Sequence, residues 1–569
     1  MKKSIRTILI TFLFSIACFA SDFTAVSDTL PFTCGELLGR PTANSITIHA
    51  CTNRDLDVYF EYGTDSLNFT NSTNVKRCLD SIPFVEVLGN LSPNTQYYYR
   101  MRYREIGMTN FFARGTHTFH TARPAGSTFT FAVEADPHLD TNSIPAVYTL
   151  TLQNILSKKP DFLLDLGDTF MSEKLASQTQ LEITKRHLLL REYFDHACHS
   201  IPLFLTIGNH EGELGWRLDG TATSLPVLAS NTRKLYYPNP EPDAFYSGNS
   251  TPEQFVGLRQ NYYAWEWGDA LFIVIDPYWY TKTKPGWGWT LGATQYNWFK
   301  SVVTTSQAKF KFVFCHQIVG GNGNDGRGGT EYAGLFEMGG LNLDSTWGFF
   351  TNRPGWEKPI HSLMVENNVS IFFHGHDHFY GRQEKDGVIY QEVPQPSSKS
   401  FTNISATQYG YVNGVFLPSR GYLLLTVNDT SAKVEYIRTY LPSEENSQRH
   451  NGDIGHSYTI IKSPTGIKQE PQTIPDEYKL HQNYPNPFAA GSPSGNSETV
   501  IRYELPVEGY VSLKVYDMLG VEVSTLVDEV QKGGSHEYKF SAKNLSSGIY
   551  FYRLSSGAFS ATKRMLLLK

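Results

Sequence analysis

The pattern of apolar and polar residues divides the chain into three stretches, and each stretch predicts one folded domain. Between about 31 and 123 the alternation has the period of two that is typical of β-strands, as at 45–50, 56–62 and 96–103. Proline, glycine and asparagine separate these short runs. The pattern predicts an N-terminal β-sandwich at 31–123.

The pattern changes in the rest of the chain. From 127 to 442 apolar β-runs alternate with longer amphipathic stretches, such as 144–158 and 181–197, which predicts a central α/β domain. A polar, proline-bearing segment at 463–480 predicts a linker. Alternation with a period of two returns in 481–569, which predicts a small C-terminal β-sandwich. The sequence thus predicts a multidomain protein.

The first twenty residues have the pattern of a secretory signal peptide. A basic start precedes a mainly apolar run at 7–19, and small residues end it at Ala20. The run is shorter than the roughly 20 residues of a membrane-spanning helix. We therefore predict that residues 1–20 are removed and that the exported mature chain has no transmembrane segment. A membrane anchor and a lipoprotein attached at Cys18 are the alternatives.

Composition narrows the classes of protein further. The 569 residues are 40% hydrophobic and 18% charged, with a net charge of −6, which fits a soluble folded protein and disfavours a dedicated nucleic-acid-binding protein. Six cysteines in a chain of this length do not make a disulfide scaffold. In an exported protein one pair among Cys34, Cys51 and Cys78 can form a disulfide. The sequence does not say which pair.

Metal-binding side chains follow five apolar runs of the central domain, each where a predicted strand ends. The runs lie at 129–133, 162–166, 203–207, 310–315 and 370–373. Because ligand-binding residues of an α/β sheet gather at the carboxyl ends of its strands, we expect these side chains to converge. The candidate ligands are Asp136, His138, Asp168, Asn209, His316, His376 and His378.

The candidate ligands combine carboxylate or amide oxygens with imidazoles. This mixture suits Fe, Zn or Mn, and it lacks the cysteines of a structural zinc finger. Seven ligands are too many for one catalytic ion with an open position, but they suit two ions about 3.5–4 Å apart that share a bridging carboxylate. The sequence therefore predicts two divalent or trivalent metal ions.

The order of these motifs resembles that of the calcineurin-like metallophosphoesterases. The matching motifs are Asp136-x-His138, Gly167-Asp168, Gly208-Asn209-His210-Glu211, His316 and Gly375-His376-Asp377-His378. The resemblance implies that the central domain is a four-layer αββα sandwich. It implies one metal held by Asp136, His138, Asp168 and His378, and a second held by Asp168, Asn209, His316 and His376. Asp168 would bridge the two ions.

The preceding β-domain resembles a fibronectin type III module, so the layout is similar to that of the purple acid phosphatases. Two positions depart from that family. Met171 stands where those enzymes have a metal-binding tyrosine, and His138 stands where they have glycine. We therefore expect no purple charge-transfer colour. If 370–378 is one strand, His374 shares a face with His376 and His378 and lies behind them.

These features predict a phosphoesterase in which metal-activated hydroxide attacks the phosphate. The resemblance implies that His210 contacts the phosphate or protonates the leaving group, with Asp168 as the other catalytic residue and Glu211 orienting a neighbour.

The glycine-rich segment 320–329 is either a flexible loop or a substrate loop whose Arg327 binds phosphate. Tyrosines in 212–262 are expected to roof the site. A phosphomonoester is the favoured substrate; phosphodiesters or nucleotides, or a non-catalytic metal-stabilised binding protein, are the alternatives.

The last part of the chain resembles the C-terminal sorting domain of the type IX secretion system. The motifs lie at 483–488, 501–506, 515–520, 548–552 and 563–569. The resemblance implies recognition by the type IX machinery, followed by release into the medium or display at the cell surface.

Overall fold

The computed structural model describes residues 32–140, 142–462, 477–483, 486–489, 498–507, 509–542, 545–557 and 559–568. These residues belong to two compact units that divide after residue 464, and each unit is described by itself. The predicted signal peptide (1–20) and most of the predicted linker (463–476) lie outside the described residues. Among the helices of the described part, none is long and apolar enough to cross a membrane.

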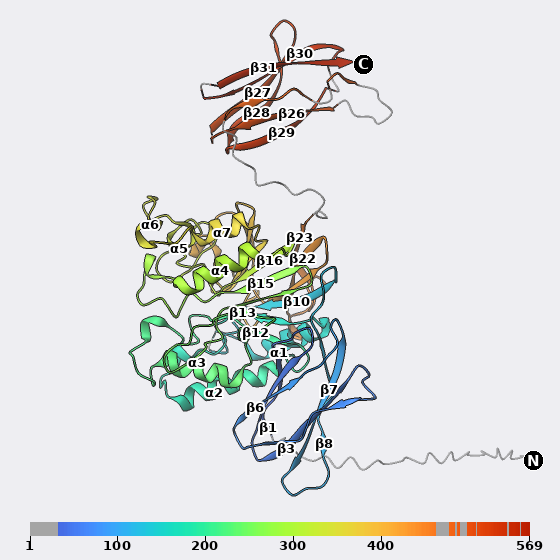
Figure 1. Cartoon of the computed structure of the whole chain (residues 1–569), viewed down its shortest axis with the longest axis vertical. Helices are drawn as coiled ribbons and strands as arrows, with labels where there is room; N and C mark the ends of the chain where they lie inside the picture. Colours follow the sequence, from blue (N-terminus) through green and yellow to red (C-terminus); the bar gives the residue numbers. More distant parts are fainter. Residues whose placement is uncertain are drawn as a thin grey trace, which may run out of the picture. The chain divides into compact units, whose positions relative to one another are not determined.

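The first unit begins with a β-sandwich (Figure 1). One sheet has the order β1 (Phe32–Gly39), β2 (Ile46–Thr52), β6 (Pro83–Leu88). The other has the order β4 (Asn71–Ser72), β3 (Leu56–Gly63), β7 (Gln96–Glu105), β8 (Phe112–Ala113), with β5 (Lys76–Cys78) on β3 and β9 (His117–His120) on β7. Alternate apolar side chains of both sheets, such as Ile48, Phe60 and Tyr99, meet in one core, as the period of two requires.

The central domain contains two larger sheets. The six-stranded sheet has the order β12 (Leu203–Leu205), β11 (Leu163–Asp165), β10 (Phe129–Glu134), β21 (Gly421–Val427), β22 (Ser431–Arg438), β23 (Ile454–Ile461). The eight-stranded sheet has the order β13 (Ser247–Gly248), β14 (Tyr263–Trp267), β15 (Ala270–Val274), β16 (Phe310–Phe314), β17 (Ile371–His374), β19 (Val388–Glu392), β18 (Tyr380–Lys385), β20 (Val415–Leu417). Because β23 pairs with β22, the first sheet continues past the predicted domain end at 442.

The two sheets pack face to face, and helices cover their outer faces (Figure 1). Phe131, Phe272 and Phe312 belong to the aromatic core between the sheets. On the six-stranded side lie α1 (Pro145–Lys158), α2 (Gln180–Phe194) and α3 (Leu225–Tyr236). On the eight-stranded side lie α4 (Ala293–Thr305), α5 (Phe336–Gly339), α6 (Phe349–Asn352) and α7 (Ile360–Glu366). This arrangement is the predicted four-layer αββα fold.

The tyrosines of 212–262 do not roof the site, so this expectation was wrong. Tyr236 and Tyr237 pack in the core beneath α2, and Tyr263 packs between the sheets. The hydroxyl of Tyr263 donates to the backbone oxygen of Leu205 at 2.9 Å. The hydroxyl of Tyr237 likewise donates to the backbone oxygen of His187, so Tyr237 and Tyr263 both find an acceptor inside the core.

Arg191 of α2 joins the N-terminal sandwich to the central domain. This fully buried guanidinium donates to the backbone oxygens of Gly35 at 2.6 Å and Tyr236 at 2.7 Å, and to Nδ1 of His49 at 2.9 Å. Burial is the main reason why the pKa of His49 falls to about 3, so the ring stays neutral and accepts this bond. Arg191 therefore fixes the two domains through one side chain.

We expect Arg191→Met to destabilise the protein by about 2–5 kcal/mol, because several buried acceptors lose their donor at once. Thermal unfolding of the purified variant should show a clearly lower Tm. Lys185→Met is a matched control on the same helix, since that side chain is 60% exposed. Equal Tm values for the two variants would contradict this role of Arg191.

The second unit is a small β-sandwich. One sheet has the order β24 (Lys479–Leu480), β26 (Glu498–Leu505), β29 (Gly534–Ser541). The other has the order β25 (Phe488–Ala489), β31 (Phe559–Leu568), β30 (Gly548–Ser556), β27 (Gly509–Tyr516), β28 (Glu522–Gln531). Inward side chains such as Ile501, Leu513 and Tyr552 form its own core. This core explains why the unit is compact by itself.

Candidate metal centre

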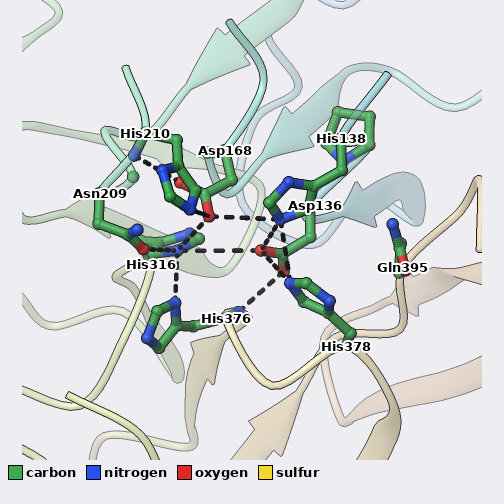
Figure 2. Close-up of polar contacts among 12 residues, drawn as sticks. Asp136, His138, Asp168, Asn209, His210, His316, His376, His378 and Gln395 are labelled. Carbon is green, nitrogen blue, oxygen red and sulfur yellow. Dashed lines mark hydrogen bonds and ion pairs between the residues drawn. The ribbon is translucent and has the colours of Figure 1, made fainter. Parts of the chain in front are cut away.

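The candidate ligands meet because the parallel strands of each sheet deliver them to the same end of two facing sheets. β10, β11 and β12 run parallel in one sheet, and β15, β16 and β17 run parallel in the other. The loops that follow these strands carry the seven candidate ligands, which point toward one another in Figure 2. All seven are thus brought together, as the strand-end pattern predicts.

The side chains form two groups that can each hold a metal ion. The first group is Asp136, His138 and His378. The Nε2 atoms of its two histidines lie 3.5 and 3.4 Å from Oδ1 of Asp136. The second group is Asp168, His316 and His376. In that group Nε2 of His316 lies 3.4 Å from Oδ2 of Asp168 and 3.3 Å from Nδ1 of His376.

Asp168 lies between the two groups. Its Oδ2 atom is 3.4 Å from Nε2 of His138 in the first group and 3.4 Å from Nε2 of His316 in the second. Asn209 lies beside the second group, with Oδ1 3.1 Å from Nε2 of His316. Oδ2 of Asp168 and Oδ1 of Asp136 are buried oxygens without a hydrogen-bond donor. Buried anionic oxygens of this kind are costly unless a cation neutralises them, so the donor set fits two metal ions.

The electrostatics of the groups also suit cations. Burial acts to raise the pKa of Asp168, but His316 and His210 outweigh it and hold that pKa well below its usual range. Burial lowers the pKa of His376, which keeps its imidazole neutral. Burial opposes a charge on His316 as well, but Asp168 and Asp136 raise its pKa to about 10. A bound metal ion would displace that proton, so metal affinity should rise with pH.

The ligand loops depend on unusual backbone geometry. Asp136, Asp168, His376 and His378 have φ values of 60°, 56°, 79° and 63°, in the left-handed region that L-residues rarely adopt. A Cβ atom on Gly208 would lie 2.3 Å from the backbone nitrogen of Asp168, so only glycine allows this approach. Strain of this kind persists where the surrounding structure enforces it, which is common at functional sites.

Glu211 ties two of these loops together. Its carboxylate is buried and accepts hydrogen bonds from the backbone nitrogens of Gly208 at 2.6 Å and Thr169 at 2.7 Å. Each bond satisfies a donor beside a candidate ligand. The structure therefore shows Glu211 orienting its neighbours.

His210 lies at the edge of the two groups (Figure 2), and Glu173 contacts its ring. Nε2 of His210 is 3.9 Å from Oδ2 of Asp168, and Nδ1 is 3.0 Å from Oε2 of Glu173. Glu173 belongs to the 3₁₀ turn Ser172–Lys174, and its backbone nitrogen donates to the backbone oxygen of His210. Sequence reasoning missed Glu173, because no motif links it to a histidine 37 residues away.

Arg327 contacts the loop that carries His376. Its Nη1 atom donates to the backbone oxygen of His376 at 2.7 Å and to Oδ1 of Asp377 at 2.9 Å, and its guanidinium lies over the ring of Tyr409. The glycine-rich segment is therefore fastened to the metal-binding loop and is not a free surface loop. These contacts give Arg327 a positioning role, and its contact with phosphate stays a prediction.

His374 does not share a strand face with His376 and His378, so that expectation was wrong. β17 ends at His374, and the two following histidines lie in a turn with left-handed residues. Nδ1 of His374 is 2.8 Å from Oε2 of Glu392, and both side chains are buried. Oε1 of Glu392 accepts a bond from the backbone nitrogen of Asp377. Glu392 thus supports the metal-binding loop, and His374 lies beside it.

Comparison with known protein families identifies the domain that carries the candidate metal centre. The family model described as calcineurin-like phosphoesterase matches residues 129–380. The central domain is a calcineurin-like phosphoesterase. This confirms the resemblance drawn from its motifs and identifies residues 129–380 as a metallophosphoesterase domain. Among curated proteins, no sequence is similar enough to this chain to count as a match.

The fold of the phosphoesterase is shared with solved structures of low sequence identity. A structure of PhoD is 16% identical, has a TM-score of 0.54, and the match covers 77% of this chain and 93% of PhoD. The purple acid phosphatase PPD1 from yellow lupin (Lupinus luteus) seeds is 14% identical and has a TM-score of 0.50. The match covers 75% of this chain and 74% of PPD1. At these identities the comparison shows the fold alone.

The second unit is also identified. The family model of the secretion system C-terminal sorting domain matches residues 482–568. This confirms the predicted type IX sorting domain, which marks the phosphoesterase for export to the cell surface or the medium.

Proposed function

We propose that this protein is an exported phosphatase that uses two metal ions to hydrolyse phosphate esters, with monoesters as the preferred class. The observation that carries the proposal is the pair of ligand groups with Asp168 between them and His210 beside them. Asp136, His138 and His378 would hold one ion, and Asn209, His316 and His376 the other. When bound, the two ions would supply Lewis acidity to the phosphate oxygens and lower the pKa of the attacking water.

The chain's own residues complete the site. Glu173 accepts a hydrogen bond from Nδ1 of His210, so Nε2 faces the space beside Asp168. From that position His210 can contact a phosphate oxygen and donate a proton to the oxygen of the leaving group. This step favours esters with a poor leaving group, which need that proton. A diester or a nucleotide could bind the same centre and is the alternative.

A non-catalytic binding protein is the alternative of another class. A structural metal site does not require a partly exposed histidine that is held at its edge by a carboxylate. The side chain of His210 is 22% exposed, whereas that of His316 is buried. This contrast favours an enzyme.

The test combines metal analysis with a substrate panel. We expect about two metal ions per chain after reconstitution with Mn, Zn or Fe, and faster turnover of a phosphomonoester than of a phosphodiester or a nucleotide. The Fe-loaded protein should lack a strong visible band, because the Met171 thioether cannot replace a phenolate. One ion per chain would refute the dinuclear centre, and a preference for diesters would refute the substrate class.

Removal of the sorting domain should separate delivery from catalysis. A chain that ends at Pro464 keeps every proposed ligand and the complete first unit. We therefore expect unchanged kcat/KM and Tm but no delivery beyond the periplasm of a type IX-competent host. Activity assays on periplasm, cell surface and medium provide the measurement. Active truncated enzyme in the medium would show that export does not need the tail.

A further inference from the structure

Two cysteines of the N-terminal sandwich lie opposite each other on neighbouring strands. Cys34 of β1 and Cys51 of β2 are paired in the antiparallel register. Residues paired in this way have Cα atoms about 4.5–5.5 Å apart, which is inside the range of about 4.4–6.8 Å that a disulfide needs. Both side chains are buried, with 3% and 1% exposed. The register therefore places the two cysteines within the Cα separation that a disulfide needs.

The remaining described cysteines have no such partner. Cys78 pairs with Leu56 in the opposite sheet of the sandwich, and its thiol points to the backbone oxygen of Lys76. Cys198 and Cys315 are buried in the central domain, against α2 and against α4 and α7 respectively. The register therefore selects one pair from the three that the sequence leaves open.

We propose that Cys34 and Cys51 form a disulfide bond when the protein enters an oxidising compartment during export. The Cys51 thiolate would attack the disulfide of a thiol–disulfide oxidant, and a mixed disulfide would form. The Cys34 thiolate would then displace the oxidant, which leaves as a dithiol with the two electrons and two protons. The neighbouring Cys34 lowers the pKa of the Cys51 thiol, which suits Cys51 to the first attack.

The bond would fasten a strand that holds the two domains together. The β1–β2 ladder is irregular on both sides of Cys34. The next residue, Gly35, accepts a bond from Arg191 and donates to Oδ2 of Asp195, and Glu36 pairs with Arg114 at 2.8 Å. A cross-link at Cys34 therefore holds β1 where its backbone ladder is interrupted and its contacts to α2 begin.

Peptide mapping of the full chain tests the proposal. Protein exported by a type IX-competent host is denatured without reductant, alkylated with iodoacetamide, digested and analysed by mass spectrometry. We expect a peptide pair joined through Cys34 and Cys51, lighter by two hydrogen atoms than the separate peptides, and alkylated Cys78, Cys198 and Cys315. Alkylation of both Cys34 and Cys51, or a bond from either to Cys78, would overturn the proposal.

A second measurement tests the effect on stability. Reductant should lower the Tm of the wild-type protein and of the control Cys78→Ser by several degrees, but not that of the double variant Cys34→Ser/Cys51→Ser. Cys78 is a matched control because it is equally buried in the same sandwich. A reductant-induced shift of the same size in the double variant would show that the stabilising effect comes from elsewhere.

Discussion

Asp168→Ala will abolish metal loading and hydrolysis together. Oδ2 of Asp168 lies 3.4 Å from a histidine of each ligand group, so its loss removes a ligand from both proposed ions at once. The same change removes the acceptor for the backbone nitrogen of His210, which bonds Oδ1 at 2.8 Å. We expect kcat/KM to fall more than about 100-fold. Mutation of a residue that only contacts a metal ligand costs about 10–100-fold, and the loss of a ligand should exceed that.

Metal content per chain and kcat/KM are measured on the same preparation. Asp140→Ala is a matched control, because this aspartate lies near the site in the sequence and its carboxylate pairs with Lys174 at 3.3 Å. The control should keep about two ions and most of the activity. An Asp168→Ala protein with full metal content would show that Asp168 does not bridge the ions.

The metal centre was predictable because its ligands follow a regular rule. Asp136, Asp168, Asn209 and His316 each come soon after a short apolar run, and within each of the two sheets the parallel strands end at a common edge. The rule needs only the position of the strand end. It therefore works even though the strands are three to six residues long.

The same rule fails where the geometry departs from a regular strand. Alternation predicts that His374, His376 and His378 share a face, but the chain leaves β17 at His374 and turns through left-handed residues. Sequence periodicity carries no information about such turns. The tyrosines at 236–237 and 262–263 were misplaced for a related reason, because an aromatic residue suits a core and a pocket wall equally well.

Contacts between side chains that are distant in the sequence were also not predicted. Glu173 holds His210 across 37 residues, and Glu392 supports the loop after His374 from a neighbouring strand. Neither glutamate stands at a motif position, so only the folded structure brings them to the site. Arg327 was noticed for its charge, but its contacts to Asp377 and His376 appear only in three dimensions.

His210→Ala should leave about two metal ions bound but reduce kcat about 10²–10⁴-fold, the usual loss when a general acid is removed. His210 is not needed to complete either ligand group, since each has its three members without it. The loss should be largest for a monoester with a poor leaving group, such as an alkyl phosphate, and smallest for an aryl phosphate that departs without a proton.

Glu173→Gln tests how His210 is held. The amide of glutamine can still accept the bond from Nδ1, so we expect a smaller loss of kcat than with Glu173→Ala, and unchanged metal content in both variants. Glu182→Ala is the matched control, since this exposed glutamate pairs only with Lys185 among the described ion pairs. If His210→Ala lost metal to the same extent as Asp168→Ala, His210 would be a ligand. An equal loss for alkyl and aryl phosphates would instead mean that His210 binds the phosphate and does not protonate the leaving group.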